Sequence, residues 1–187
     1  MGDIKKIRKK YSKPEHPWRI SRIEEENKIC KEFGIPKKTE LWKTVSKLES
    51  YKNQAKSLVT VDRGQTEEKN QKQKNLLLQK LKKYNLVKDD DTIDAILSLT
   101  LTDLLNRRLQ TIVFKKGYAK TMKQARQMIT HRHILVNNRI LTSPSYLVKV
   151  EEENSIEISP KSPFYSTDHP ERAKESSKRK TKKVKTR

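Results

Sequence analysis

The chain has 187 residues, enough for one or two small domains, and only 32% of them are hydrophobic. Its 44 lysines and arginines outnumber 23 aspartates and glutamates, which gives a formal net charge of +21. This surplus requires a polyanionic partner. Nucleic acid is the economical choice, because no apolar run is long enough to cross a membrane and the charged N-terminus is unlike a signal peptide.

Residues 1–17 are predicted to form a basic N-terminal tail. The first thirteen residues hold six lysines and arginines against Asp3 alone. Tails of this composition often become ordered only along a nucleic acid, although a purely solubilising tail has the same composition.

Residues 18–101 are predicted to form a helical body. The expected helices cover residues 19–33, about 39–58, 66–84 and 93–98. Gly34 ends the first helix, and leucines at helical spacing mark the buried sides of the next two. Trp42 and Tyr51 either stack on bases or close the small core. We favour the core, because the chain has only eleven aromatic residues to build one.

Residues 102–159 are predicted to form a basic module of two helices and a small sheet. Thr102 is the expected N-cap of a helix that Gly117 ends, and the second helix is expected from Thr121 to about His131. Alternation predicts strands at 134–136, 140, 146–150 and 155–158, with turns at Asn137-Asn138 and 151–154. Helical body and module together give an α+β fold class.

The module carries the candidate binding residues. From Asp103 to Lys149 it has ten lysines and arginines against that one aspartate. Cations would neutralise phosphates, and uncharged polar groups would bond to sugar hydroxyls and bases. The candidate RNA-binding residues are Arg107, Arg108, Lys115, Lys116, Lys120, Lys123, Arg126, Gln127, His131, His133, Asn137 and Arg139. Their expected scaffold is Leu105, Leu109, Ile112, Ala125, Ile129 and Val136.

His131 and His133 admit two interpretations. As RNA contacts they would donate to phosphate or stack on a base, and otherwise they have structural roles. Because they straddle a helix-to-strand junction, we expect the two side chains to point to different places.

Residues 160–187 are predicted to form a basic C-terminal extension. Phe164 and Tyr165 are expected to dock back on the body. Residues 171–187 hold nine lysines and arginines against two glutamates, a composition that suits phosphate neutralisation and also a nuclear-import signal.

No metal, cofactor or enzymatic activity is predicted. Cys30 is the only cysteine, so no intrachain disulfide is possible and a reducing cytoplasmic setting is expected. Four scattered histidines do not complete a zinc site, and four glycines cannot supply a phosphate loop. Asp89, Asp90 and Asp91 lack the spacing, glycine and glutamate of a calcium loop, so we interpret them as a charged turn before a short helix.

The module closely resembles the S-four domain, an RNA-binding module, over the stretch RRLQTIVFKKGYAKTMKQARQMITHRHILVNNRILTSPSYLV. The matching pieces are Arg-Arg-Leu at 107–109, Gly-Tyr-Ala-Lys at 117–120, Ala-Arg-Gln at 125–127, His-x-His-Ile-x-Val-Asn at 131–137 and Pro-Ser-x-x-Val at 144–148. The combined signature is specific, whereas no single piece is. Several protein classes share this domain, so it does not fix the function alone.

From Met1 to about Tyr165, the chain resembles small-subunit ribosomal proteins of the S-four family, in the archaeal and eukaryotic-type branch. The segments that carry this resemblance are GDIKKIRKKYSKPEHPW, ELWKTVSKLESYKNQAKSL and RRLQT. Bacterial members tend to have aspartate in place of Gln110, and some carry an N-terminal cysteine cluster that this chain lacks.

The resemblance implies binding to the five-prime domain of small-subunit ribosomal RNA early in assembly, and a role in translation accuracy near the messenger entry side. It also implies small-subunit neighbours, notably protein five, and a cytoplasmic location. No membrane or small-molecule partner is expected. The alternative is a stand-alone heat-shock or RNA-chaperone protein of the same domain class, which would not need the helical body.

Overall fold

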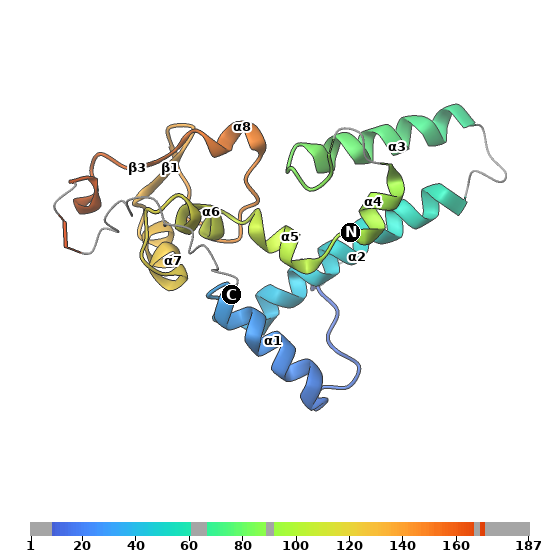
Figure 1. Cartoon of the computed structure of the whole chain (residues 1–187), viewed down its shortest axis with the longest axis horizontal. Helices are drawn as coiled ribbons and strands as arrows, with labels where there is room; N and C mark the ends of the chain where they lie inside the picture. Colours follow the sequence, from blue (N-terminus) through green and yellow to red (C-terminus); the bar gives the residue numbers. More distant parts are fainter. Residues whose placement is uncertain (1–8, 61–66, 89–91, 167–168, 171–187) are drawn as a thin grey trace, which may run out of the picture.

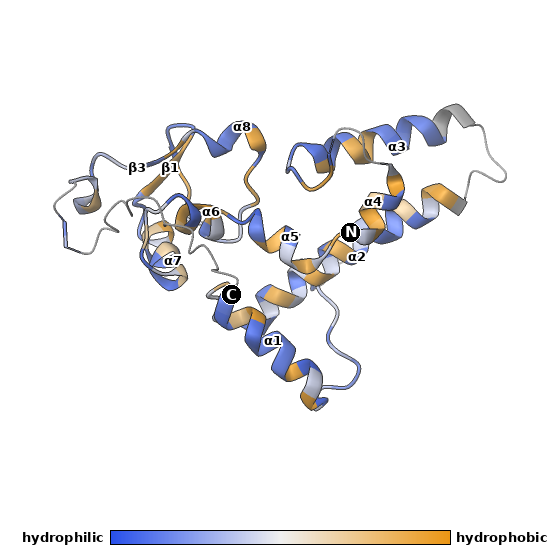
Figure 2. Ribbon diagram, in the orientation of Figure 1, coloured by the Kyte–Doolittle hydropathy of each residue, from blue (hydrophilic) through white to orange (hydrophobic). Residues whose placement is uncertain are grey.

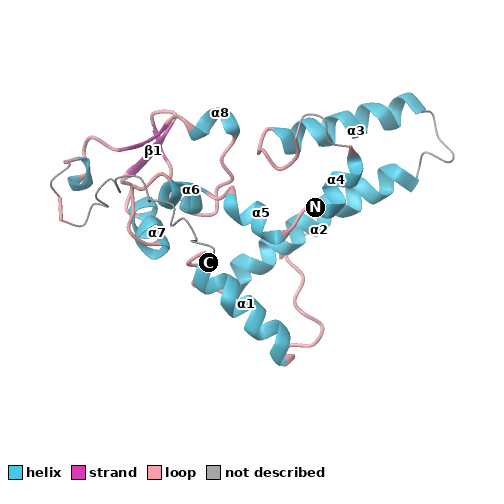
Figure 3. Ribbon diagram, in the orientation of Figure 1, coloured by secondary structure: helices cyan, strands magenta, loops and turns pink. Residues whose placement is uncertain are grey.

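The computed structural model describes residues 9–60, 67–88, 92–166 and 169–170. Its elements are α1 (Ile20–Glu32), α2 (Lys38–Thr60), α3 (Glu67–Lys82), α4 (Ile93–Ser98), α5 (Leu101–Asn106), α6 (Leu109–Lys115), α7 (Met122–Thr130), β1 (Ile134–Val136), β2 (Arg139–Ile140), α8 (Val150–Glu153), β3 (Ile156–Ile158) and the 3-10 turn η2 (Pro163–Tyr165). Helices with one small antiparallel sheet confirm the α+β class (Figures 1 and 3). The predicted aspartate turn, residues 1–8 of the N-terminal tail and most of the C-terminal extension lie outside the described residues.

The helical body is organised along α2, the longest described helix, with α3 returning beside it and α4 and α5 packed against it (Figure 1). Figure 2 shows that hydrophilic residues cover much of α3. Its apolar positions Leu77 and Leu81 are buried against Ala55 and Tyr51 of α2. Tyr51 is therefore a core residue, as we favoured.

The first predicted helix of the module, from Thr102 to Gly117, is wrong as a single helix, because the structure has two shorter helices there, α5 and α6. The chain breaks at Arg107 and Arg108, and the amide of Leu109 donates to the carbonyl of Tyr146 at 2.8 Å. The N-cap of α5 is Thr100 rather than the predicted Thr102. The amide of Thr100 donates to the carboxylate of Asp103 at 2.8 Å in a capping box.

The module packs α6 and α7 on a sheet with strand order β2-β1-β3. Leu135 pairs with Ile140 on one side and Glu157 on the other. Asn137 (φ 49°) and Asn138 (φ 61°) both have positive φ, as a two-residue hairpin turn requires, and asparagine tolerates this conformation. The predicted turn is confirmed, and the expected scaffold residues are buried.

The predicted strand at 146–150 is wrong. Leu147 makes only an isolated bridge with Arg108, and the chain then turns into α8. Glu152 explains the helix, since its carboxylate accepts from the amide of Lys149 at 3.2 Å and from the hydroxyl of Tyr146 at 2.9 Å. That hydrogen bond and the burial of the phenol raise the pKa of Tyr146 to about 12, with burial as the larger cause.

The body and the module share a third apolar cluster, in which Leu105 packs among Phe33, Ile35 and Leu41. Beside it, the buried amide of Gln110 donates to the carbonyls of Phe33, Gly34 and Met122 at 2.9–3.3 Å. Buried amide hydrogen bonds require defined geometry, so this junction sets how the module sits on the body.

Candidate nucleic-acid interface

One side of α7 carries three of the candidate residues. Thr121 caps the helix by accepting from the amide of Gln124 at 3.2 Å. Met128 and Ile129 face the core, while Lys123, Gln127 and His131 are exposed. Their spacing of four residues aligns them along one face of the helix. The predicted polar face of α7 is therefore present in the structure.

The end of α7 adds a cation that the candidate set omits. Arg132 has φ 67°, a left-handed conformation that favours glycine. The amide of His133 reaches back to the carbonyl of Met128 at 2.9 Å, which closes the helix end in the manner of a Schellman motif. Arg132 is exposed directly beyond the α7 face. The sequence signal that we missed was a basic residue between two candidate histidines. Its left-handed conformation is visible only in the structure.

The two histidines lie together, contrary to our expectation. The rings of His131 and His133 are nearly parallel, with an interplanar angle of 18° and centroids 6.3 Å apart. The left-handed turn at Arg132 lets the chain reverse sharply between them. His131 is exposed, whereas His133 is half-buried.

His133 ties the C-terminal segment to the module. Its Nδ1 lies 2.9 Å from the hydroxyl of Ser162, and its ring meets the edge of Phe164 at 5.1 Å. Burial, and secondarily the charge of His131, lowers the pKa of His133 below its ordinary 6.5. Phe164 packs on the core of the module rather than on the body, and Tyr165 is exposed. These contacts give His133 a structural role.

Other candidate residues lie on the end of α6, on the turn that follows it and on the β1–β2 hairpin. Asn137 and Arg139 are exposed on the β1–β2 hairpin. Lys115 is exposed at the end of α6, while Lys116 donates to the carbonyl of Glu153. Lys120 is exposed and donates to the carbonyl of Pro170 at 2.6 Å.

Three of the candidate arginines are engaged within the protein. Arg107 is buried and pairs with Glu153 at 2.9 Å, and Arg108 is buried and pairs with Glu40 at 3.0 Å. Arg126 holds the same Glu40 at 2.7 Å but keeps a quarter of its side chain exposed. In this arrangement Arg108 stabilises the junction and Arg107 stabilises the module itself, and neither is presented to an outside partner.

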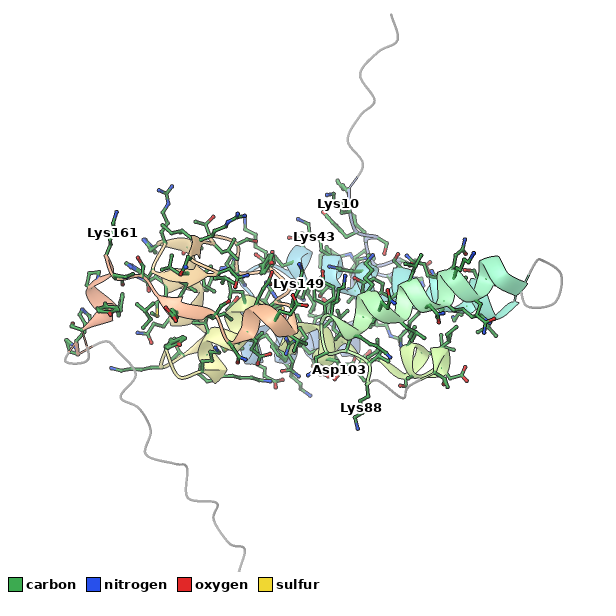
Figure 4. All side chains as sticks on the ribbon, turned by 90° about the horizontal axis from the view of Figure 1, so that it is seen from above. Lys10, Lys43, Lys88, Asp103, Lys149 and Lys161 are labelled. Atoms are coloured by element: carbon green, nitrogen blue, oxygen red, sulfur yellow. The ribbon has the colours of Figure 1, made fainter. Side chains whose placement is uncertain are left out.

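Charge alone does not single out the interface. Figure 4 shows Lys10 and Lys161 projecting from one side of the molecule and Lys88 from the opposite side. The α7 face differs because directional groups, Gln127 and His131, lie between cations on a helix with a fully packed underside. This combination is suited to a rigid, structured polyanion.

The S4 domain family model matches residues 107–154. The Small ribosomal subunit protein uS4 of Methanococcus maripaludis (strain C7) is 47% identical over 173 residues, which cover 92% of this chain and 95% of that protein. The protein of the same name from Methanococcus vannielii is also 47% identical over the same shares. The chain belongs to the uS4 family of small-subunit ribosomal proteins.

Membership in the uS4 family confirms the predicted archaeal-type branch and accounts for the small basic module. The relatives are named as small ribosomal subunit proteins. No helix among the described residues is long and apolar enough to cross a membrane. Over the same residues, no cluster of three or more histidine, cysteine, aspartate or glutamate side chains is arranged to hold a metal ion.

Proposed function

We propose that this uS4-family chain is a structural constituent of the small ribosomal subunit and binds the five-prime domain of its ribosomal RNA. The observation that carries the proposal is the exposed α7 face, where Lys123, Gln127 and His131 share one side of a helix. The relatives are named as small ribosomal subunit proteins, which supports the assignment to this subunit. The module supplies the chemistry for a structured polyanion.

Each exposed residue has a role that follows from its chemistry. Lys123, Arg132 and Arg139 contact phosphates, with arginine able to hold two oxygens at once. Gln127, His131 and Asn137 supply directional hydrogen bonds to sugar hydroxyls and bases. Lys115, Lys116, Lys120 and the exposed part of Arg126 extend the positive surface. Arg107, Arg108 and His133 hold the scaffold.

The junction between body and module supports recognition by shape. Structured RNA is read through the relative placement of several surfaces, which requires a rigid protein. The hydrogen bonds of Gln110 and the ion pairs of Glu40 provide this rigidity. A stand-alone heat-shock or chaperone protein of this domain class would not need a body locked to its module.

The proposal also includes a role early in assembly and support of translation accuracy near the messenger entry side. It further includes contact with small-subunit protein five and a cytoplasmic location. They rest on the family resemblance. No cofactor or small-molecule substrate takes part in it.

The test is a binding titration against a five-prime-domain fragment of small-subunit ribosomal RNA, with transfer RNA as competitor, at two salt concentrations. We expect tight binding that survives competition. Equal, salt-sensitive binding of both RNAs would instead support a generic polyanion binder of the chaperone type.

Matched lysine variants locate the interface. Lys123→Ala should weaken binding to the fragment several-fold and reduce the slope of log K against log salt by about one. Lys72→Ala removes an exposed lysine from α3, a helix outside the module, and should have little effect. If the two variants weaken binding equally, the α7 face is not the interface.

A further inference from the structure

The chain's two tryptophans line the same cleft, far along the sequence from the module. The cleft, of about 500 Å³, lies between residues 11–18 and the helices α1 and α2. Trp18 forms part of its rim and leaves 88% of its surface exposed. Trp42 lies deeper and is half-buried. A large indole left open to water beside a preformed cleft indicates a missing partner.

Hydrogen bonds hold the walls of this cleft in place. The guanidinium of Arg22 donates to the carbonyl of Pro17 at 2.8 Å and to Glu26 at 2.5 Å. The indole of Trp42 donates to the same Glu26 carboxylate at 3.0 Å. The residue before Trp18 is thus fixed to α1, so Trp18 is presented on an anchored turn, and a ligand would meet a cleft whose walls are already ordered.

The charge around the cleft selects the kind of partner. Lys13, Arg22 and Lys38 line it against one carboxylate, that of Glu26. Glu26 is neutralised within the protein, because Arg22 and Lys38 both pair with it. A ligand that fits has a flat aromatic face for the indole and a negative charge for the lysines. An unpaired nucleotide has both, whereas a purely apolar peptide segment would leave two of the three positive charges of the lining uncompensated.

We propose that this cleft receives an unpaired base of RNA, stacked on Trp18, with the adjoining phosphates held by Lys13 and Lys38. The site rests on the proposed function in that its partner is RNA, but it is a second surface, separate from the α7 face. It reads exposed bases, while the α7 face binds structured RNA. Stacking of this kind tolerates any base.

The fluorescence of Trp18 tests the proposal directly. In the full chain carrying Trp42→Phe, Trp18 is the only tryptophan. A single-stranded oligoribonucleotide should quench its fluorescence at saturation, because a stacked base contacts the indole directly. The same sequence as a duplex offers no unpaired base and should leave the fluorescence nearly unchanged. Equal quenching by both would indicate electrostatic association alone and overturn the proposal.

Affinity provides the second readout. Trp18→Ala should weaken binding of the single-stranded oligonucleotide about 5- to 150-fold, the equivalent of ~1–3 kcal/mol for one stacked base. Trp18→Phe should retain most of the affinity. Ile20→Ala is the matched control, since Ile20 is 71% exposed two residues away and has no stacking face.

The outcomes separate this proposal from the function proposed above. If Lys123→Ala weakens binding to the ribosomal RNA fragment, while Trp18→Ala leaves the oligonucleotide affinity unchanged and Trp18 fluorescence responds equally to single strand and duplex, only the tryptophan site is wrong. The cleft would then be assigned to an apolar segment of a neighbouring protein. If Lys123→Ala has no effect, the α7 interface fails, whatever the result for Trp18.

Discussion

Glu40 of α2 and Arg126 of α7 form a two-pronged ion pair, with nitrogen–oxygen distances of 2.7 and 3.1 Å. Arg108 reaches the same carboxylate from the break between α5 and α6, at 3.0 Å. One acidic residue of the body therefore holds two arginines of the module. This explains why residues that the sequence assigns to RNA are committed to the protein's own architecture.

Replacing Glu40 by glutamine should destabilise the protein. Among the described residues, Glu40 is the only hydrogen-bond partner of the Arg108 guanidinium, whose side chain is 2% exposed. Breaking a buried pair leaves an uncompensated charge, so we expect a loss of about 3 kcal/mol in the free energy of unfolding, measured by urea titration. Glu49→Gln, an exposed site on the same helix, should change it by less than about 0.5 kcal/mol. Equal losses of stability in the two variants would contradict the inference that Glu40 holds the two arginines.

The Glu40 contribution should also depend on pH. Burial alone would raise the pKa of this carboxyl, but hydrogen bonds and charge from Arg126 and Arg108 outweigh it, so the pKa lies below its ordinary 4.5. A pKa depressed by folding stabilises the protein above the unfolded value and loses that effect as pH falls through the folded value. The stability difference between wild type and Glu40→Gln should be full at pH 7 and shrink below about pH 4.5. A difference that persists unchanged in acid would disprove the charge-based account.

Gly34 should not tolerate a side chain, because the module approaches it closely. Its φ is +60°, and a Cβ placed there would lie 2.9 Å from Cβ of Met122. Gly117 also has a positive φ, +79°, but open space around it. Gly117→Ala should therefore cost about 1–2 kcal/mol from backbone strain alone. Gly34→Ala should cost clearly more, measured by thermal or urea unfolding, and similar losses would mean that the junction adapts.

Local signals in the sequence predicted local structure well. The start of the second module helix near Thr121, the apolar side of α7 and the Asn137-Asn138 turn depend on neighbouring residues, so their pattern was sufficient. The break at Arg107 and Arg108 was missed because its cause lies elsewhere, in the carbonyl of Tyr146 and the carboxylate of Glu40. No periodicity reports a partner that distant.

The same distinction applies to the candidate site. The sequence identified the exposed side of α7 because helix geometry fixes which residues share a face. It did not distinguish exposed arginines from Arg107 and Arg108, because their burial depends on distant partners. Arg107 contacts Val148 and Glu153, and Arg108 contacts Glu40. Long-range ion pairs therefore decide which cations remain available to a partner.

Arg132→Gly should separate stability from RNA binding. Arg132 occupies a left-handed conformation that costs a non-glycine residue about 1–2 kcal/mol, whereas glycine adopts it freely at an entropic cost of roughly 0.5–1 kcal/mol in the unfolded chain. The free energy of unfolding should therefore stay the same or rise.

The affinity of Arg132→Gly for the ribosomal RNA fragment should nevertheless fall several-fold, with a shallower salt dependence, because an exposed cation beside His131 is lost. The measurements are a urea titration and a binding titration on one protein preparation. Arg132→Lys, which keeps the charge, should recover much of the affinity. A glycine variant that binds RNA as tightly as wild type would show that this costly arginine serves the helix end alone, and the α7 face would then end at His131.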